Sequence, residues 1–392
     1  MRKIGIFGGT FNPIHNGHLN LISSFQKEFQ FDEILLVPSN VPPHKQTVNL
    51  VGKEHRIKMC QLATEDLSNV SVNEIEFERE GKSYTYDTLR ELKKRYKEAE
   101  FYLIVGSDMF LTLKTWYNYD KLKKMVVFCT ACRKQEEFKN ISDFAEGLRL
   151  EGAQCHILNI NVVEVSSSEI REKIMFGEEY SSLIPEKVYN YIKSEKIYDI
   201  EKAIPFYKDI LTKKLESKRY NHSLNVAESA VKLAKKYGAN ENKAFFAGLL
   251  HDITKQEDEK IQLQILGNSA IICDEIEKKN KRLWHAITGA WYVKNILGIH
   301  DVEVIDAIRW HTEFRVNATL LDKIIYLADF ISLDRDYKDV DVMRKKCDSS
   351  LEEGLIYGLS FTIKENAQNN FPIAIESVNA YNSLLDSYKI KE

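Results

Sequence analysis

The sequence predicts an α/β domain with a parallel β-sheet, followed by an all-α domain. Up to about residue 195, apolar runs of strand length alternate with stretches of helical periodicity, which is typical of a parallel sheet covered by helices. Beyond Pro205 the strand-like runs stop and apolar residues recur at helical spacing. A chain of 392 residues is also too long for a single core. We therefore expect two domains, residues 1–199 and 200–392, with a boundary near Ile200.

The expected elements follow one another along the chain. Five apolar runs predict strands at residues 3–7, 33–37, 101–105, 125–128 and 156–158. A helix is expected to open near Gly17, after the glycines that follow the first strand. In the second domain, helical periodicity is clearest over residues 226–234, 244–250, 284–297 and 324–331. Because ligands of parallel sheets bind at the carboxyl ends of the strands, the first site is expected there.

Composition narrows the possible partners. The chain has 55 Lys and Arg against 58 Asp and Glu, which gives no electrostatic argument for nucleic acid or a membrane surface as a partner. Neither a secretory h-region nor a long apolar run is evident, so a cytoplasmic location is expected. The six cysteines are scattered, which favours reduced thiols. Cys129 and Cys132 form a C-x-x-C without the second pair of a zinc site.

The most informative segment is GGTFNPIHNGHL at residues 8–19. Glycines after a strand let the backbone approach a ligand, and the N-H groups of the following helix favour an anion. His15 and His18 would flank that anion in an H-x-G-H pattern. The segment resembles the adenylyltransferases of the nucleotidyltransferase superfamily, and its residue sequence is most similar to that of nicotinate-nucleotide adenylyltransferase. This resemblance implies a Rossmann-like nucleotidyltransferase domain that uses ATP, with Mg²⁺ accompanying the nucleotide.

Further segments match the same family. Residues 165–171, VSSSEIR, resemble its S-S-x-x-I-R signature, where hydroxyls and an arginine gather on phosphate. Residues 83–89, 106–111 and 115–117 resemble the enzymes that act on nicotinic acid mononucleotide, and an aromatic ring at Trp116 can stack on a pyridine. Phosphopantetheine stays open as another acceptor. The implied catalytic residues are His15, His18, Lys45 and Arg171. Those implied to bind ATP are Gly8, Gly9, Thr10, Phe11, Gly106, Asp108, Ser167 and Ser168, and those implied to bind the nicotinate nucleotide are Thr85, Trp116 and Tyr117.

The second domain carries histidines and aspartates in the order H, HD, H, H, D. Neutral imidazoles and carboxylates are suitable ligands for a hydrolytic divalent metal. His251-Asp252 ends an apolar run, so both polar groups would lie at the edge of a core where they need partners. The chain supplies a contrast in His300-Asp301, where Asp301 follows a glycine turn and is expected to cap the next helix.

The sequence around these residues resembles the HD phosphohydrolase superfamily, and in particular the bacterial symmetrical diadenosine tetraphosphatases. The resemblance implies iron or another divalent transition metal held by His222, His251, Asp252 and Asp329. It implies polyphosphate binding by Arg219, His285, His311, Thr312 and Arg335. The number of metals, one or two, stays open. The second domain could also act on another nucleotide, or it could be a metal-binding module without catalytic activity. The expected protein is a fused enzyme acting on ATP, nicotinic acid mononucleotide and diadenosine tetraphosphate, and a homo-oligomer stays open.

Overall fold

The computed structural model describes residues 1–41, 50–79, 81–132, 135–161, 163–268 and 273–389. Its contacts divide the chain into two compact units, and each is described by itself. The first comprises Met1–Lys173 and Glu179–Tyr198, and the second comprises Ile174–Glu178 and Asp199–Glu392. The chain therefore passes between the units three times.

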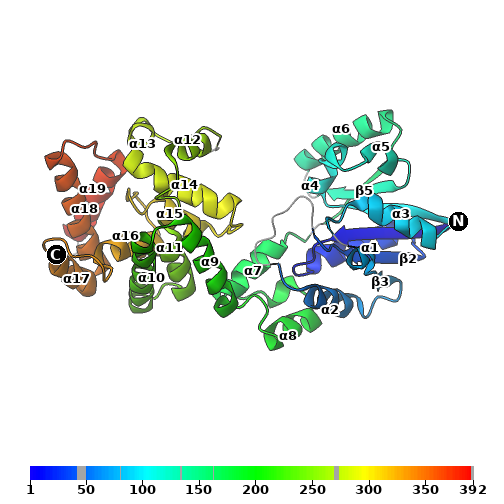
Figure 1. The fold of residues 1–392 in the computed structure, drawn as a ribbon, viewed down its shortest axis with the longest axis horizontal. Helices are drawn as coiled ribbons and strands as arrows, with labels where there is room; N and C mark the ends of the chain where they lie inside the picture. The colour runs from blue at the N-terminus through cyan, green and yellow to red at the C-terminus, as the bar shows by residue number, and fades with distance from the viewer. Residues whose placement is uncertain (42–49, 80, 133–134, 162, 269–272, 390–392) are drawn as a thin grey trace. The chain divides into compact units, whose positions relative to one another are not determined.

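The first unit is built on a six-stranded parallel sheet with the strand order β3-β2-β1-β4-β5-β6 (Figure 1). The strands are β1 (Arg2–Gly9), β2 (Glu33–Pro38), β3 (Val70–Val72), β4 (Ala99–Ile104), β5 (Val127–Cys132) and β6 (Gln154–Asn159). All the strands expected from the sequence are present, and β3 is an addition. The order reverses between β1 and β4, which opens the crevice where ligands of such sheets bind.

Helices and short 3-10 turns connect these strands. The helices are α1 (Asn16–Phe29), α2 (Lys53–Thr64), α3 (Thr85–Arg95), α4 (Ser107–Phe110), α5 (Tyr119–Leu122), α6 (Gln135–Leu150), α7 (Ser167–Phe176) and α8 (Glu186–Ser194). The 3-10 turns are η1 (Ile75–Glu78), η2 (Leu113–Thr115) and η3 (Ser181–Leu183). α2 packs beside β2 and β3, and α6 packs beside β5 and β6. The last residues of α7 belong to the second unit.

The C-x-x-C pair lies inside a strand. The apolar run at residues 125–128 predicted a strand ending near Cys129, but β5 continues through Cys132. Both thiols are buried, and Cys132 Sγ lies 3.6 Å from the carbonyl oxygen of Leu158. Burial raises the pKa of both thiols, so they stay protonated at neutral pH. The pair is packed as small apolar side chains.

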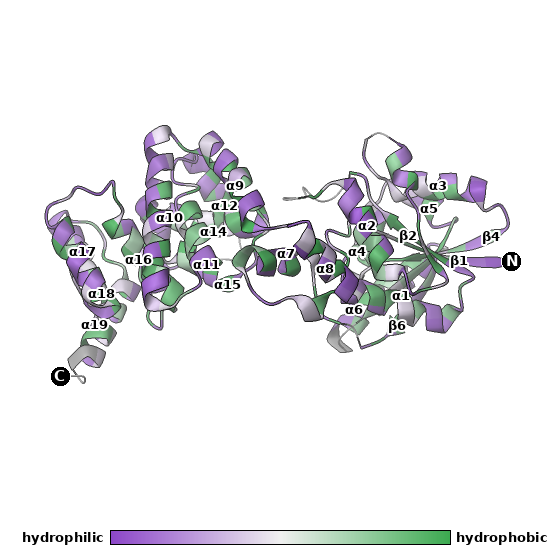
Figure 2. Ribbon diagram, turned by 90° about the horizontal axis from the view of Figure 1, so that it is seen from below, coloured by the Kyte–Doolittle hydropathy of each residue, from purple (hydrophilic) through white to green (hydrophobic). Residues whose placement is uncertain are grey.

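The second unit is helical. Its helices are α9 (Ile200–Lys214), α10 (Ser217–Tyr237), α11 (Glu241–Leu250), α12 (Glu259–Asn268), α13 (Glu275–Lys279), α14 (Lys281–Asn295), α15 (Val302–Arg309), α16 (Leu320–Ile331), α17 (Val340–Ser349), α18 (Leu351–Gln368) and α19 (Ile375–Lys389). Hydrophilic and hydrophobic residues share single helices such as α10, as expected of helices around a core (Figure 2). Within the described part of the chain, no helix is both long and apolar enough to cross a bilayer.

The backbones of α10 and α11 meet at Gly248. A Cβ atom built on Gly248 would lie 2.9 Å from Ala227 Cα and 3.2 Å from the carbonyl oxygen of Val226. The absence of a side chain at Gly248 therefore permits this approach. α10 carries His222 and α11 ends directly before His251, so the contact sets the distance between two predicted metal ligands.

Candidate functional site

A cavity of about 420 Å³ lies at the carboxyl ends of β1 and β4 in the first unit. This volume falls in the range of small-molecule sites. The residues expected to act on phosphates or ATP that line it are Gly8, Gly9, Thr10, Phe11, His15, His18, Gly106, Asp108, Ser167, Ser168 and Arg171. The residues expected to hold the nicotinate nucleotide that line it are Thr85, Trp116 and Tyr117. Lys45 lies outside the described residues.

The two histidines of the H-x-G-H segment are stacked on one another. Their ring centroids lie 3.6 Å apart with an interplanar angle of 28°. The backbone N-H of His15 donates to His18 Nδ1 at 3.2 Å. Because Nδ1 accepts this hydrogen bond, a neutral His18 carries its proton on Nε2, where it can be donated to a ligand oxygen. Phe11 packs edge-on against the same ring, at a centroid distance of 5.0 Å.

The glycines of this segment have different roles. A Cβ on Gly9 would lie 2.8 Å from the ring of Phe11, and one on Gly17 would lie 3.0 Å from the carbonyl oxygen of Val163. Protein packing alone therefore disfavours a side chain at both positions. At Gly8 the nearest atom to a built Cβ is 4.0 Å away, so this glycine leaves open space beside the cavity.

Helix α7 carries most of the S-S-x-x-I-R segment and places it beside the GGTFNPIHNGHL segment. Arg171 Nη1 donates to the carbonyl oxygen of Asn12 at 2.7 Å, and its Nη2 donates to Ser168 Oγ at 3.1 Å. Ser167 Oγ donates to the carbonyl oxygen of Pro13 at 2.8 Å. Asn12 also belongs to this site, although no role was predicted for it; its Oδ1 accepts a hydrogen bond from the hydroxyl of Tyr198 at 2.8 Å. This hydrogen bond could not be predicted because Asn12 and Tyr198 lie far apart in the sequence.

Aromatic side chains gather at another part of the cavity. Tyr117 packs on Tyr84 with ring centroids 4.7 Å apart, and the Trp116 indole donates to Thr112 Oγ1 at 3.1 Å. Thr85 is the first residue of α3, so its backbone N-H is among those that a helix leaves free at its start. A negatively charged ligand group is favoured at such a position.

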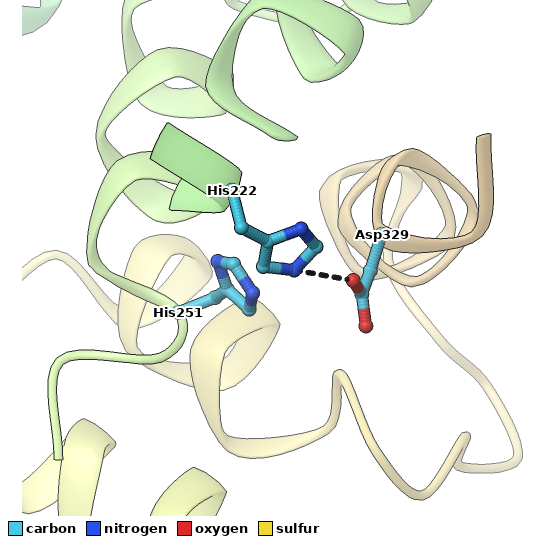
Figure 3. Close-up of side chains that lie close together, drawn as sticks. All are labelled: His222, His251 and Asp329. Carbon is cyan, nitrogen blue, oxygen red and sulfur yellow. Dashed lines mark ion pairs between the residues drawn. The ribbon is translucent and has the colours of Figure 1, made fainter. Parts of the chain in front are cut away.

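In the second unit, the predicted metal ligands converge from three separate segments. His222 comes from α10, His251 and Asp252 follow α11, and Asp329 comes from α16. Figure 3 shows the two imidazoles and the Asp329 carboxylate turned toward a common point. His222 Nε2 lies 3.0 Å from Asp329 Oδ1, and His251 Nε2 lies 3.5 Å from Asp252 Oδ2.

Two overlapping groups of side chains have the spacing of metal ligands. His222, His251 and Asp329 form one group, and His251, Asp252 and His311 form the other, with the donor atoms of each group within 4.8 Å of one another. The Nε2 atoms of His222 and His251 are buried and face carboxylate oxygens of Asp329 and Asp252. Buried imidazole nitrogens and carboxylate oxygens that converge in this way fit a divalent cation.

The electrostatics of the cluster favour ionised carboxylates. Burial raises the pKa of Asp252, but the nearby imidazoles of His251, His311 and His285 outweigh burial and hold that pKa well below its usual range. For Asp329, burial is likewise outweighed by His222 and Arg335. Burial and the Lys255 ammonium group lower the pKa of His285 well below its usual range. Burial lowers the pKa of His251, but the Asp252 and Asp329 carboxylates outweigh it and raise that pKa. Metals bind ionised carboxylates and neutral imidazoles, so a metal at this site would displace a proton from His251.

The residues expected to bind polyphosphate surround this cluster. Arg219 Nη1 contacts Asp252 Oδ2 at 2.8 Å, and Arg335 forms an ion pair with Asp329. His285 Nε2 lies 3.2 Å from both Asp252 Oδ1 and His311 Nε2. The Oγ1 atom of Thr312, next along the chain from His311, is buried without a hydrogen-bond partner among the described residues.

Two charged residues of this site were missed by the sequence analysis. Lys255 Nζ lies 3.0 Å from His285 Nε2, and the HD-x-x-K spacing from His251 is the sequence signal that marks it. Asp334 Oδ2 lies 2.8 Å from His222 Nδ1. Asp334 sits in a turn 112 residues further along the chain, where no motif marks it.

The His300-Asp301 pair has a structural role, as expected, and differs in this from His251-Asp252. Asp301 caps α15, because its Oδ1 accepts from the backbone N-H of Val304 at 3.0 Å. It also pairs at 2.8 Å with the largely buried Lys243, which contacts Glu178 and Glu303 as well. Asp301 therefore neutralises a buried ammonium group in addition to capping the helix.

Comparisons with known proteins match each half separately. A cytidylyltransferase-like family matches residues 6–173, and an HD domain matches residues 219–334. Over 200 residues the chain is 40% identical to a Bacillus licheniformis protein named "probable nicotinate-nucleotide adenylyltransferase", covering 51% of this chain and 100% of the relative. An Exiguobacterium sibiricum protein of the same name is 39% identical over 197 residues, covering 50% of this chain and 98% of the relative.

A solved structure is similar to part of this chain. It is titled a "predicted HD superfamily hydrolase involved in NAD metabolism" and comes from Clostridium acetobutylicum. It is 35% identical, covers 46% of this chain and 96% of its own, and superposes with a TM-score of 0.45.

Proposed function

We propose a function for each half from the premise that this chain belongs to the nicotinate-nucleotide adenylyltransferase family through its first half and has an HD domain in its second. The first half, residues 1–199, transfers AMP from ATP to nicotinic acid mononucleotide, giving deamido-NAD and pyrophosphate. One observation carries this proposal: a single cavity is lined by the stacked histidines, the start of α7 and the aromatic residues near Trp116.

The side chains of the cavity suit this reaction. Nucleotidyl transfer requires that two substrates are held in line and that charge on the transferred phosphate is met by donors. We assign His18, with its proton on Nε2, to the transferred phosphate, and His15 to holding the His18 ring by stacking. Ser167, Ser168 and Arg171 would bind the remaining phosphates of ATP with Mg²⁺, and we assign Lys45, which lies outside the described residues, to the same phosphates.

Acceptor choice tests this proposal. Pyrophosphate release from ATP is measured with nicotinic acid mononucleotide, its amide and phosphopantetheine as alternative acceptors. The acid is expected to have the highest kcat/KM, because its carboxylate would meet the free N-H groups at the start of α3 near Thr85. Equal values for the acid and the amide would contradict the role of Thr85, and a preference for phosphopantetheine would contradict the substrate assignment.

We infer that the second half, residues 200–392, hydrolyses diadenosine tetraphosphate symmetrically to two ADP. The inference is supported by the two candidate ligand groups that share His251. Iron or another divalent transition metal, held by His222, His251, Asp252 and Asp329, would supply Lewis-acid activation of water and of the phosphoanhydride. The positive side chains Arg219, Lys255 and Arg335 line the same cluster and suit a polyphosphate.

A product analysis with a metal assay tests the second activity. The full chain is purified anaerobically, its metal is quantified, and diadenosine tetraphosphate is incubated with wild type and with Asp252→Ala. Wild type is expected to yield ADP, and Asp252→Ala is expected to lose metal and hydrolysis together while adenylyl transfer is retained. Hydrolysis of a different nucleotide would redefine the substrate, and bound metal without hydrolysis of any nucleotide would indicate a metal-binding module.

A further inference from the structure

Asp334 holds one of the predicted metal ligands from outside the cluster. Its Oδ2 lies 2.8 Å from His222 Nδ1, on the side of the ring opposite the Nε2 atom that faces His251 and Asp329. Its Oδ1 accepts a hydrogen bond from Asn225 Nδ2 at 3.1 Å. Asn225 is one turn beyond His222 on α10, so the same helix face binds both oxygens of the carboxylate.

The turn that carries Asp334 is braced from α17. Arg344 Nη2 donates to the carbonyl oxygens of Ser332 and Arg335, both at 3.1 Å, and so fixes the backbone on either side of Asp334. The backbone N-H of Arg335 also donates to the carbonyl oxygen of Ser332 at 3.0 Å. Although the Asp334 side chain is 35% exposed, its position is therefore determined by the fold.

The contact sets the tautomer of a metal-bound His222. Both ring nitrogens face carboxylates, Nδ1 that of Asp334 at 2.8 Å and Nε2 that of Asp329 at 3.0 Å. Because a carboxylate only accepts hydrogen bonds, Nδ1 carries the proton that it donates to Asp334, and a metal held beside Asp329 would take the lone pair of Nε2. Histidines that bind metals commonly donate their other ring N-H to a carboxylate, which fixes the ring and increases its basicity.

We propose that Asp334 is a positioning residue for a divalent metal: it orients His222 and keeps its Nε2 lone pair directed at the site shared with His251 and Asp329. This inference rests on the proposed metal-dependent function of the second half. Asp334 acts through His222 and does not itself bind the metal.

Metal affinity of the full chain tests the proposal independently of hydrolysis. Metal is removed with a chelator, and Co²⁺ is titrated back in competition with a chromophoric chelator while the visible Co²⁺ absorption is recorded. Asp334→Ala is expected to lower the affinity 10- to 100-fold and to alter the absorption bands. Asp334→Asn keeps an oxygen that can accept from Nδ1, so its loss should be smaller. The control is Asp336→Ala, which changes an exposed aspartate two residues further along the chain and should bind as wild type does.

A double-mutant cycle separates positioning from a general charge effect. In a His222→Ala background, removing Asp334 is expected to change the remaining affinity by less than twofold. An equal loss in both backgrounds, or an Asp334→Ala affinity equal to that of Asp336→Ala, would overturn the proposal. Unfolding temperatures measured in the presence of chelator verify that the variants are folded. If Asp334→Ala is not folded, the metal affinity of Asp334→Asn relative to wild type tests the proposal instead. Failure of wild type to bind Co²⁺ would overturn the metal site itself and, with it, this inference.

Discussion

Two buried helical glycines in the second unit are expected to respond in opposite ways to alanine. At Gly248 the new Cβ would meet backbone atoms of α10, 2.9 Å from Ala227 Cα and 3.1 Å from its nitrogen. Backbone atoms cannot rotate away as the end of a side chain can, so α10 and α11 must separate. At Gly289 in α14 the nearest atoms would lie 3.5 Å away, which is an ordinary contact.

The magnitudes follow from two opposing effects. Alanine is favoured over glycine inside a helix by about 0.8 to 1 kcal/mol at either position. Overpacking a core costs about 1 to 3 kcal/mol, and contact with backbone places Gly248 in the upper part of that range. We therefore expect Gly248→Ala to lower the free energy of unfolding by about 1 to 2 kcal/mol and Gly289→Ala to raise it by about 1 kcal/mol.

The change at Gly248 should also reach the ligand cluster. The Gly248 carbonyl oxygen accepts a hydrogen bond from His251 Nδ1 at 2.6 Å, and His222 lies on the opposing helix. Metal-ligand distances tolerate deviations of only about 0.2 Å, so helix separation should weaken metal binding. Gly289→Ala should leave metal affinity unchanged or slightly altered, because its nearest contacts are of ordinary length.

Urea unfolding followed by tryptophan fluorescence measures both variants in the full chain. Three of the four tryptophans, Trp284, Trp291 and Trp310, belong to the helical unit, so the signal reports mainly on it. Metal affinity is measured on the same samples. If Gly248→Ala were as stabilising as Gly289→Ala, and bound metal as tightly as wild type, the inferred clash between α10 and α11 would be refuted.

Three further substitutions test individual side chains. His18→Ala is expected to lower kcat for adenylyl transfer 100- to 1000-fold, about 2.7 to 4 kcal/mol, with little change in KM for ATP, and unchanged pyrophosphate release would contradict its role. Trp116→Ala should raise KM for nicotinic acid mononucleotide about fivefold, through loss of about 1 kcal/mol of stacking, while diadenosine tetraphosphate hydrolysis is retained. Asp301→Ala should cost about 2 kcal/mol in urea unfolding, about 1 for the helix cap and about 1 for the ion pair with Lys243. Its metal content should stay at the wild-type level, and loss of metal would contradict a structural role.

Much of the fold was predictable because buried strands and helices leave periodic apolar patterns. The strand β3 was not, since three residues that are only partly buried or exposed produce no readable run. The segment around His18 was recognisable because its residues are contiguous, and the cavity residues could be collected from motifs of the same kind. The interactions of Asn12 and Asp334 could not be predicted, because each contacts a partner more than 100 residues away. Asn12 lies in a recognisable segment, but nothing in that segment indicates its contact with Tyr198, and Asp334 lies in no motif. Asp301 shows both cases: its helix cap is local and was predicted, whereas its pairing with Lys243 depends on tertiary structure.

The threading of the chain between the two units bears on how the protein can be divided. Met175 and Phe176 lie in the core of the helical unit, where Asn240 Nδ2 donates to the Phe176 carbonyl oxygen at 2.8 Å. A truncation that starts at Ile200 would remove both core side chains, and losing a buried phenylalanine alone costs about 3 to 5 kcal/mol. A cut before Ile174 would instead deprive the first unit of Tyr198, whose hydroxyl binds Asn12. Proteolysis or premature termination between Lys173 and Asp199 would therefore damage at least one half, whichever bond is cut. A cell that makes this chain intact obtains the two halves in a fixed one-to-one ratio.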